Sequence, residues 1–255
     1  MLRWKARTER RRRGREAESP ALARRLYLDL IKRCLTNAIY DPDFMDGHGW
    51  PKSAHSMLSL KRLDNIQFCI ETVLRDDVPG DLIETGVWRG GATIFMRAAL
   101  KSYAIDDRTV WVADSFKGLP APAAEHPADA ESELHLYKDL AVSLEEVMEN
   151  FRKYELLDGQ VRFLEGWFSD TLPHCPIERL AVLRLDGDMY ASTMDALRHL
   201  YPRLSVGGYV IVDDYGAVPA CKSAVHDYRD GHHIAEPIIE IDWTGVYWRK
   251  SVATP

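Results

Sequence analysis

Short apolar runs alternate with amphipathic stretches from residue 81 to residue 230. The apolar runs have the length and composition of buried strands, and they cover residues 81–84, 109–113, 160–164, 180–185 and 209–212. The amphipathic stretches between and after them have apolar positions at helical spacing, and they cover residues 91–103, 143–155, 191–201 and 219–230. An alternation of strand and helix is typical of an α/β fold, in which helices cover a mostly parallel sheet.

The end of the chain has a different pattern. Two β runs, residues 237–241 and 246–248, flank a short turn that contains Thr244 and Gly245. Two such runs around a turn with glycine are typical of an antiparallel hairpin. We therefore expect a hairpin at one edge of the sheet.

The start of the chain divides into a tail and a helical segment. Residues 1–20 contain few large apolar side chains and end at Pro20, so we expect a basic disordered tail outside the fold. The folded domain is then expected over residues 21–255. Its first part, residues 21–78, is expected to be mainly helical.

Two helices are predicted in this segment from the helical spacing of apolar side chains, over residues 21–40 and 54–75. Residues 41–51 between them are rich in Gly, Pro and Asp, which predicts a loop. Tyr40 and Trp50 lie at the edges of this loop, where their rings could cover a ligand.

Composition and length agree with one large α/β domain. The chain has 255 residues, of which 46% are apolar. No run of about 18 apolar residues occurs, and no apolar segment follows the charged start, so we expect neither a membrane span nor a secretory signal. The cysteines are Cys34, Cys69, Cys175 and Cys221. Their wide spacing, without a CxxC pair, is typical of reduced thiols in a cytoplasmic protein.

Charge is distributed unevenly along the chain. Residues 1–18 hold 8 basic and 3 acidic side chains, which leaves 25 basic and 36 acidic side chains for the rest of the 33 and 39. An acidic body argues against a nucleic-acid surface on the folded domain. The basic tail is either a plain extension or a segment that binds phosphate backbones.

A glycine-rich loop follows the first predicted strand. Its residues are Glu84, Thr85, Gly86, Val87, Trp88, Arg89, Gly90 and Gly91. Small residues let the backbone approach a ligand, and free N–H groups at a helix start donate to it. The spacing fits neither the dinucleotide fingerprint nor a Walker A loop, which weakens NAD and ATP as ligands. An acid before the glycine fits a ligand with a cationic amino group, such as that of methionine, and a plain tight turn is the alternative.

Two further loops supply candidate binding residues. Asp114, followed by Ser115, ends the second predicted strand, where a carboxylate can accept both hydroxyls of a ribose. The alternative is that Asp114 caps the following turn. The residues after the third strand are Gly166, Trp167, Phe168 and Ser169. An aromatic ring there either supports an adenine or packs in the core.

The strongest group of candidate residues follows the fourth and fifth strands. Asp186 and Asp188 come after the fourth strand, and Asp213 and Asp214 come after the fifth. Consecutive strands are usually neighbours, so Asp186, Asp213 and Asp214 are expected close together. Crowded carboxylates repel one another unless a cation neutralises them, and such oxygen ligands suit Mg²⁺ or a similar divalent ion. The alternative is that one or two of these acids cap helices or pair with arginine.

A divalent ion at this place has a use in hydroxyl chemistry. It lowers the pKa of a bound alcohol oxygen and orients two neighbouring hydroxyls. A nearby carboxylate then removes the proton, and either Asp186 or Asp188 is placed to do so. Residues 120–136, rich in Ala, Pro, Glu and His, are either a lid over the acceptor or a surface insertion.

Seven stretches of the chain resemble a known family. They are YLDL at 27–30, AHSM at 54–57, LIETGVWRGGATIFM at 82–96, VWVADSF at 110–116, LAVLRLDGDMY at 180–190, YVIVDDY at 209–215 and GVYWR at 245–249. With these motifs, residues 27–250 resemble the macrocin O-methyltransferase family, the deoxysugar O-methyltransferases of macrolide and aminocoumarin antibiotic assembly. The long motif at 82–96 is highly specific.

The resemblance implies a fold, a reaction and an acceptor. The fold is the Rossmann-like fold of class I S-adenosylmethionine (SAM) methyltransferases, with a seven-stranded mostly parallel sheet, a C-terminal antiparallel hairpin and N-terminal helices. The reaction moves a methyl group from SAM to a sugar hydroxyl of a glycosylated natural product. The family's oligomers, which are dimers or larger, bring N-terminal segments near the active site, so Tyr40, Ser56 and Met57 are expected to touch cofactor or acceptor.

The resemblance also implies the roles of the strand-end residues. SAM lies in the Glu84 loop, and Asp114 accepts its ribose hydroxyls. Mg²⁺ lies on Asp186, Asp213 and Asp214, with the sugar diol completing its shell. Asp186 touches both the cofactor and the metal and is the favoured base. The tail is not part of the family pattern, and the identity of the sugar stays open.

Two other classes of protein remain as alternatives. One is a metal-dependent phenol or catechol O-methyltransferase, but catechol enzymes usually carry a lysine shortly after the first aspartate, where this chain has Met189. The other is an NAD-binding or nucleotide-sugar oxidoreductase, or a degenerate binding protein. The missing fingerprint argues against NAD, and the intact set of Asp186, Asp213 and Asp214 argues against degeneration.

Overall fold

The structure is a computed structural model that describes residues 2–40 and 51–252, with side chains from Ser19 onward. In these residues, seven strands form one sheet in the order β3-β2-β1-β4-β5-β7-β6. The strands are β1 (Asp81–Thr85), β2 (Val110–Asp114), β3 (Val161–Glu165), β4 (Leu180–Leu185), β5 (Leu204–Val212), β6 (Ile239–Glu240) and β7 (Val246–Arg249). The α-helices are α1 (Leu2–Leu35), α2 (Leu60–Arg75), α3 (Gly91–Ser102), α4 (Leu144–Lys153), α5 (Phe168–Thr171), α6 (Tyr190–Leu200) and α7 (Pro219–Gly231). The 3₁₀ turns are η2 (Pro127–Asp129), η3 (Leu134–Leu136), η4 (Lys138–Leu140), η5 (Leu172–His174) and η6 (Tyr201–Arg203).

The strand pairing confirms the predicted mixed sheet. Strands β1 to β5 pair in parallel, and β7 pairs antiparallel with both β5 and β6. Strand β4 has the predicted bounds, whereas β5 begins at Leu204, earlier than predicted. A register shift lets Leu204 pair with Leu180 and Tyr209 pair with Val182. The glycines inside this bulge hide the continuing strand from an apolar pattern.

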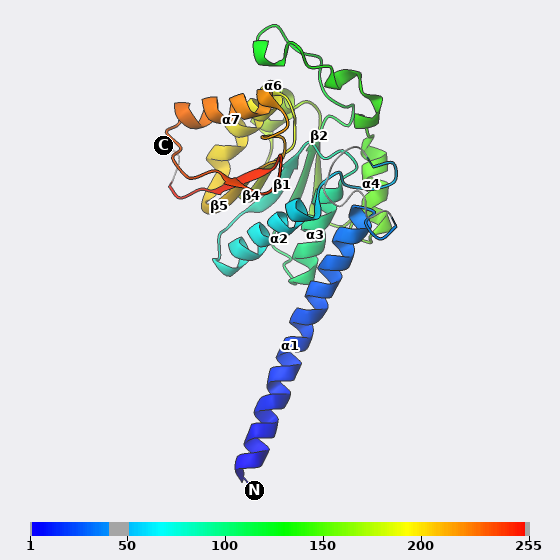
Figure 1. The fold of residues 1–255 in the computed structure, drawn as a ribbon, viewed down its shortest axis with the longest axis vertical. Coiled ribbons are helices and arrows are strands. Elements are labelled where there is room, and N and C mark those ends of the chain that lie inside the picture. Colours follow the sequence, from blue (N-terminus) through cyan, green and yellow to red (C-terminus); the bar gives the residue numbers. More distant parts are fainter. Residues whose placement is uncertain (1, 41–50, 253–255) are drawn as a thin grey trace.

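Helices cover both faces of the sheet (Figure 1). Successive strand residues point to opposite faces, so Leu82 and Val112 join one core while Ile83 and Ala113 join the other. Helices α1 to α4 pack on the first face, and α5 to α7 pack on the second. The loops at the carboxyl ends of β1, β2, β4 and β5 are thereby held between two packed layers.

Helix α1 is longer than the sequence predicts. It begins at Leu2, so residues 2–20 are helical where a disordered tail is expected. The expectation rested on low apolar content, which reports on packing, whereas Arg, Glu and Ala, which make up most of this stretch, are strong helix formers. In Figure 1 the N-terminal part of α1 projects away from the sheet. The helix is therefore formed there without a place in the domain core.

Helix α2 is shorter than predicted. It begins at Leu60 rather than Ala54, because Ser59 is its N-cap and accepts a hydrogen bond from the Arg62 N–H at 3.2 Å. The residues before it form no helix, and the N–H groups of His55 and Ser56 donate to the Leu35 carbonyl. This segment is consequently free to line a cavity.

Gly86 is the tightest point between β1 and β4. Its φ is +83°, and a Cβ there would lie 1.7 Å from the Asp186 carbonyl oxygen. We expect Gly86→Ala to lower the free energy of unfolding by at least about 2 kcal/mol, because backbone strain and overpacking add. Urea unfolding measures this, with Gly159→Ala as the control, since a Cβ at Gly159 has no neighbour within 4 Å. Equal midpoints for the two variants would contradict the expectation.

Candidate active site

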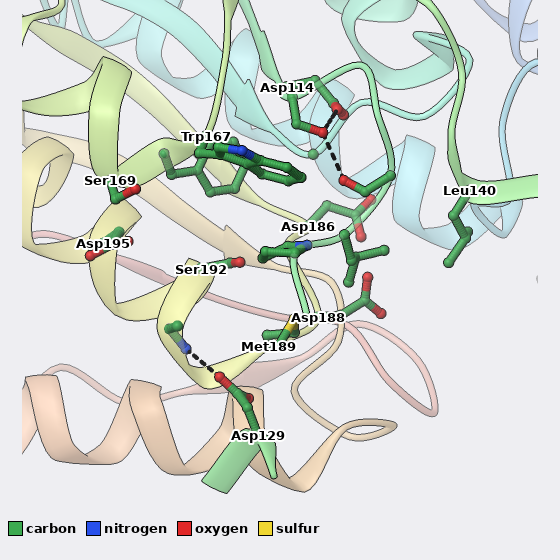
Figure 2. Close-up of a pocket in the computed structure, with 18 of the residues that line it drawn as sticks. Asp114, Asp129, Leu140, Trp167, Ser169, Asp186, Asp188, Met189, Ser192 and Asp195 are labelled. Carbon is green, nitrogen blue, oxygen red and sulfur yellow. Dashed lines mark hydrogen bonds between the residues drawn. The ribbon is translucent and has the colours of Figure 1, made fainter. Parts of the chain in front are cut away.

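The carboxyl ends of the central strands open onto two adjoining cavities. One has a volume of about 410 Å³ and the other about 200 Å³. Both are lined by Met57, Trp88, Leu140, Asp186 and Asp188. Figure 2 shows two of these aspartates close together beside one cavity. Ligands of such sheets bind at this edge, so the cavities lie where the sequence places the site.

The larger cavity contains most of the predicted cofactor residues. Its lining includes Met57, Gly86, Trp88, Asp114, Ser115, Gly166, Trp167, Phe168, Ser169 and Asp186. Figure 2 shows Asp114, Trp167 and Asp186 around the same space, at the end of β2 and on the loops after β3 and β4. The residues that sequence reasoning missed are polar ones farther along the same wall: Asp129, Ser192 and Asp195.

Asp114 is held rigidly at the end of β2. Its Oδ2 accepts the Val87 N–H at 2.7 Å, and its Oδ1 accepts the Phe116 N–H at 2.8 Å. Burial raises the pKa of this carboxyl, and these N–H groups oppose that rise. The turn-capping role and a place in the cavity are therefore combined in one side chain.

The smaller cavity contains the acidic residues. It is lined by Ser56, Met57, Glu84, Val87, Asp186, Asp188, Asp213 and Asp214, with Arg62 and Thr244 beside them. One oxygen from each of Asp186, Asp213 and Asp214 lies within 4.8 Å of the others. The structure therefore brings together the three acids that the sequence predicts as neighbours.

Burial and crowding favour the protonated forms of Asp186, Asp188 and Asp214. Burial, then the charge of Asp213, raises the pKa of Asp186 to about 6. Burial, then the charge of Asp186, raises the pKa of Asp188 to about 7. The pKa of Asp214 is also raised, by burial and then by Asp188. A bound cation would relieve this repulsion.

A buried arginine lies beside the acidic residues. Arg184, on β4, is fully buried and contacts carboxylates from three different strands. Its Nη1 donates to Glu84 and, at 2.7 Å, to Asp186, and its Nη2 donates to Asp213. Sequence reasoning missed it, although an arginine inside the apolar run 180–185 was the available signal. Asp186 and Asp213 therefore pair with arginine, which the sequence analysis gives as the alternative to cation binding.

Asp214 differs from its two neighbours. Among the described residues, its carboxylate accepts one hydrogen bond, from the Asp188 N–H at 3.0 Å. Glu84 is also incompletely paired, because its Oε1 contacts Arg184 while its buried Oε2 has no partner in the described part of the chain. Burial raises the pKa of Glu84 to about 8 although Arg184 lowers it. Both side chains keep capacity for a cationic ligand.

Two residues predicted to bind the cofactor lie outside the lining of both cavities. Tyr40 is 85% exposed and lines neither cavity, because it follows the end of α1 in a turn directed to solvent. Thr85 is buried in β1 and also lines neither cavity, since its side chain faces Arg184. Trp50 and the rest of residues 41–50 lie outside the described residues. The expected approach of Tyr40 through a second subunit stays a prediction.

Hydrogen bonds at two points hold the segment between β2 and α4 against the larger cavity. Asp129 is buried, and its carboxylate accepts the N–H groups of Tyr190 and Ala191 at 2.7 and 2.9 Å, at the start of α6 (Figure 2). At the other end, the Trp88 indole donates to the Asp139 carbonyl at 2.9 Å. The predicted lid or insertion, residues 120–136, therefore forms a wall of the larger cavity in this structure.

Asp129 caps α6 from a distant part of the chain, and its loss should be measurable. We expect Asp129→Ala to lower the free energy of unfolding by about 1 kcal/mol, the usual effect of losing a helix cap. Denaturant unfolding checks this, with Asp139→Ala as the control because that side chain is exposed in the same segment. If both variants have the same free energy of unfolding, the hydrogen bonds of Asp129 to α6 do not stabilise the fold.

The fold defines the class of protein. The solved structure of the O-methyltransferase NovP superposes with a TM-score of 0.88 at 52% identity, covering 90% of this chain and 100% of that one. The predicted class I SAM methyltransferase fold is therefore confirmed. The profile of the family described as Macrocin-O-methyltransferase (TylF) matches residues 43–250. The chain belongs to this family, and it is a SAM-dependent O-methyltransferase.

Two characterised relatives cover almost the same length. The mycinamicin III 3''-O-methyltransferase of Micromonospora griseorubida is 54% identical, over 91% of this chain and 99% of its own. The 8-demethyl-8-(2,3-dimethoxy-α-L-rhamnosyl)-tetracenomycin-C 4'-O-methyltransferase of Streptomyces olivaceus is 57% identical, over 91% and 95%. None of the helices among the described residues has the length and apolar character to cross a membrane.

Proposed function

We propose that this enzyme methylates a sugar hydroxyl of a glycosylated natural product and that a divalent ion such as Mg²⁺ assists. The names of both relatives give an O-methylation, and one of them names a rhamnosyl group. A small-molecule glycoside is therefore the proposed acceptor. A cytoplasmic location and a homodimer or larger homo-oligomer are part of the same proposal.

One observation carries the proposal: Asp186 lines both cavities. The larger cavity has the ribose-type carboxylate Asp114 and the ring of Trp167, which suit a nucleoside. The smaller cavity has Asp213 and Asp214, which suit a cation and hydroxyl oxygens. Methyl transfer requires the acceptor oxygen in line with the sulfonium methyl, so the two ligands must meet at a junction of this kind.

The acidic residues fit a divalent ion. Three carboxylate oxygens within 4.8 Å of one another are hard ligands. Arg184 and Arg62 offset part of the negative charge, but Asp214 has no cationic partner among the described residues. When bound, Mg²⁺ would lower the pKa of a hydroxyl and orient a diol. Asp186, Asp213 and Asp214 would hold it.

The side chains divide the remaining tasks. SAM supplies the electrophilic methyl group. Asp114 accepts hydrogen bonds from its ribose hydroxyls, and Trp167 supports its adenine. The unpartnered Oε2 of Glu84 is the candidate acceptor for the amino group of the methionine part, although the Arg184 contact shows that Glu84 also has a structural role. These contacts would hold the methyl group toward the acidic residues.

Asp186 is the proposed general base. It lines both cavities, so a hydroxyl held at the acidic residues and the methyl group of SAM would meet beside its carboxylate. The Arg184 guanidinium donates to its Oδ2, so Oδ1 would be the oxygen that takes the proton. Asp188 lies beside it and lines both cavities, so it is the second candidate.

An acceptor assay tests the function directly. We expect methyl transfer from SAM to O-glycosylated macrolide, tetracenomycin-type or aminocoumarin acceptors lacking one sugar methyl group, and loss of turnover with EDTA that added Mg²⁺ restores. Mass spectrometry of the products, with the aglycones as controls, locates the methyl group. Methylation of simple catechols in place of the glycosides would move the protein to the alternative class. Full turnover in EDTA would remove the metal from the mechanism.

Asp214→Asn tests the metal site with little structural change. The amide oxygen still accepts the Asp188 N–H, but the negative charge is lost. We expect turnover to fall by at least about 100-fold, the range for loss of a strong transition-state contact, while S-adenosylhomocysteine binds within about threefold of wild type because this acid lines the smaller cavity only. Calorimetry and steady-state kinetics measure the two quantities. Wild-type turnover would contradict the assignment.

A further inference from the structure

Arg62 reaches the acidic residues from outside the sheet. It lies in the first turn of α2 and is 5% exposed. Its Nη1 donates to the Asp213 Oδ2, while its Nε donates to the Asp242 Oδ2 at 3.0 Å. One guanidinium thus joins a predicted metal ligand to an acid in the turn between β6 and β7.

Asp242 is fixed from several sides. Its Oδ2 also accepts the Ser59 hydroxyl at 2.6 Å, and its Oδ1 accepts the N–H groups of Thr244 and Gly245 at 3.1 and 2.9 Å. A buried carboxylate with this many donors has one orientation. It presents a fixed acceptor to Arg62, and it does so without lining either cavity.

The same turn holds the main chain of the metal ligand. The Thr244 hydroxyl donates to the Asp213 carbonyl at 2.7 Å. Both oxygens of the Asp213 side chain accept hydrogen bonds, Oδ1 from Arg184 and Oδ2 from Arg62. Its carboxylate plane is therefore determined by two arginines, and each oxygen keeps a lone pair for a further partner.

We propose that Asp242 and Arg62 are positioning residues for the divalent-ion site, with Asp242 acting through Arg62 on Asp213. This inference rests on the metal in the proposed function. Two effects support it: Asp242 orients the fork of Arg62, and its negative charge offsets the positive charge that Arg62 brings beside a cation site. The C-terminal hairpin is then part of the site, although it contributes no ligand.

The test is direct metal binding by the full chain with S-adenosylhomocysteine present. Free Mn²⁺ is followed by its EPR signal, which needs no turnover. We expect Asp242→Asn to raise the Mn²⁺ dissociation constant by roughly 10-fold, as loss of an outer partner of a metal ligand does. The dissociation constant of S-adenosylhomocysteine should stay within about twofold, because Asp242 lines neither cavity.

Asp158→Asn is the matched control. Asp158 also accepts hydrogen bonds from a buried arginine, Arg97, whose Nε and Nη2 donate at 3.0 and 2.6 Å. Its carboxylate accepts the Gln160 N–H at 3.0 Å as well. It lies in the turn before β3 and lines neither cavity. Both variants should lose thermal stability, Asp158→Asn the less because its side chain is 37% exposed against 5% for Asp242, whereas the control should bind Mn²⁺ like wild type.

A second variant, Arg62→Lys, separates the orientation of the Asp213 carboxylate from the charge of residue 62. It also tests the inference if Asp242→Asn does not fold. Arg62→Lys keeps the positive charge but cannot bridge Asp213 and Asp242 with one planar fork. We expect it to weaken Mn²⁺ binding as well. Wild-type Mn²⁺ affinity in these variants would overturn this inference alone. Failure of wild-type protein to bind Mn²⁺ would overturn both the proposed metal and this inference.

Discussion

The buried guanidinium of Arg184 is the interaction on which the site depends. An unpaired charge in the middle of a sheet costs several kcal/mol, so Arg184 is tolerable only because Glu84, Asp186 and Asp213 surround it. These acids lie at the carboxyl ends of β1, β4 and β5, and Arg184 therefore holds the ends of three strands together. Replacing any one partner leaves charge uncompensated in the core. The register of the sheet and the geometry of the site are consequently set by the same ion pairs.

The carboxylates of the site outnumber the arginines that face them, so part of the negative charge is not compensated. Arg184 and Arg62 each donate to one oxygen of Asp213, but Asp214 receives only a backbone N–H among the described residues. Burial and then the charge of neighbouring acids raise the pKa values of Asp186 and Asp188. A site that is destabilised when empty gains free energy on binding a cation, and proteins store such strain where they bind or react.

Local pattern and sheet topology account for what the sequence predicted well. The apolar run 180–185 has the observed bounds of β4, and adjacency of consecutive parallel strands placed Asp186, Asp213 and Asp214 together before any coordinates. Arg62 and Asp242 could not be found in this way. They are 180 positions apart, and their pairing depends on how α2 and the hairpin pack on the sheet. Hydrophobic periodicity carries no information on such contacts, and it also missed the helical conformation of residues 2–20.

Acceptor choice must be determined outside this shared core. In the proposed function, deprotonating a sugar hydroxyl would make the same demand on Asp186 whichever hydroxyl reacts, and the two relatives are named for different positions, 3'' and 4'. The larger cavity is closed on one side by the segment between β2 and α4, which Asp129 and Trp88 tie to α6 and to the glycine loop. Residues on such an insertion can change without disturbing the strand ends. The proposed function would thus separate specificity from catalysis: the strand ends would hold the base and the other acids, and the segment between β2 and α4 would shape the space that the acceptor enters.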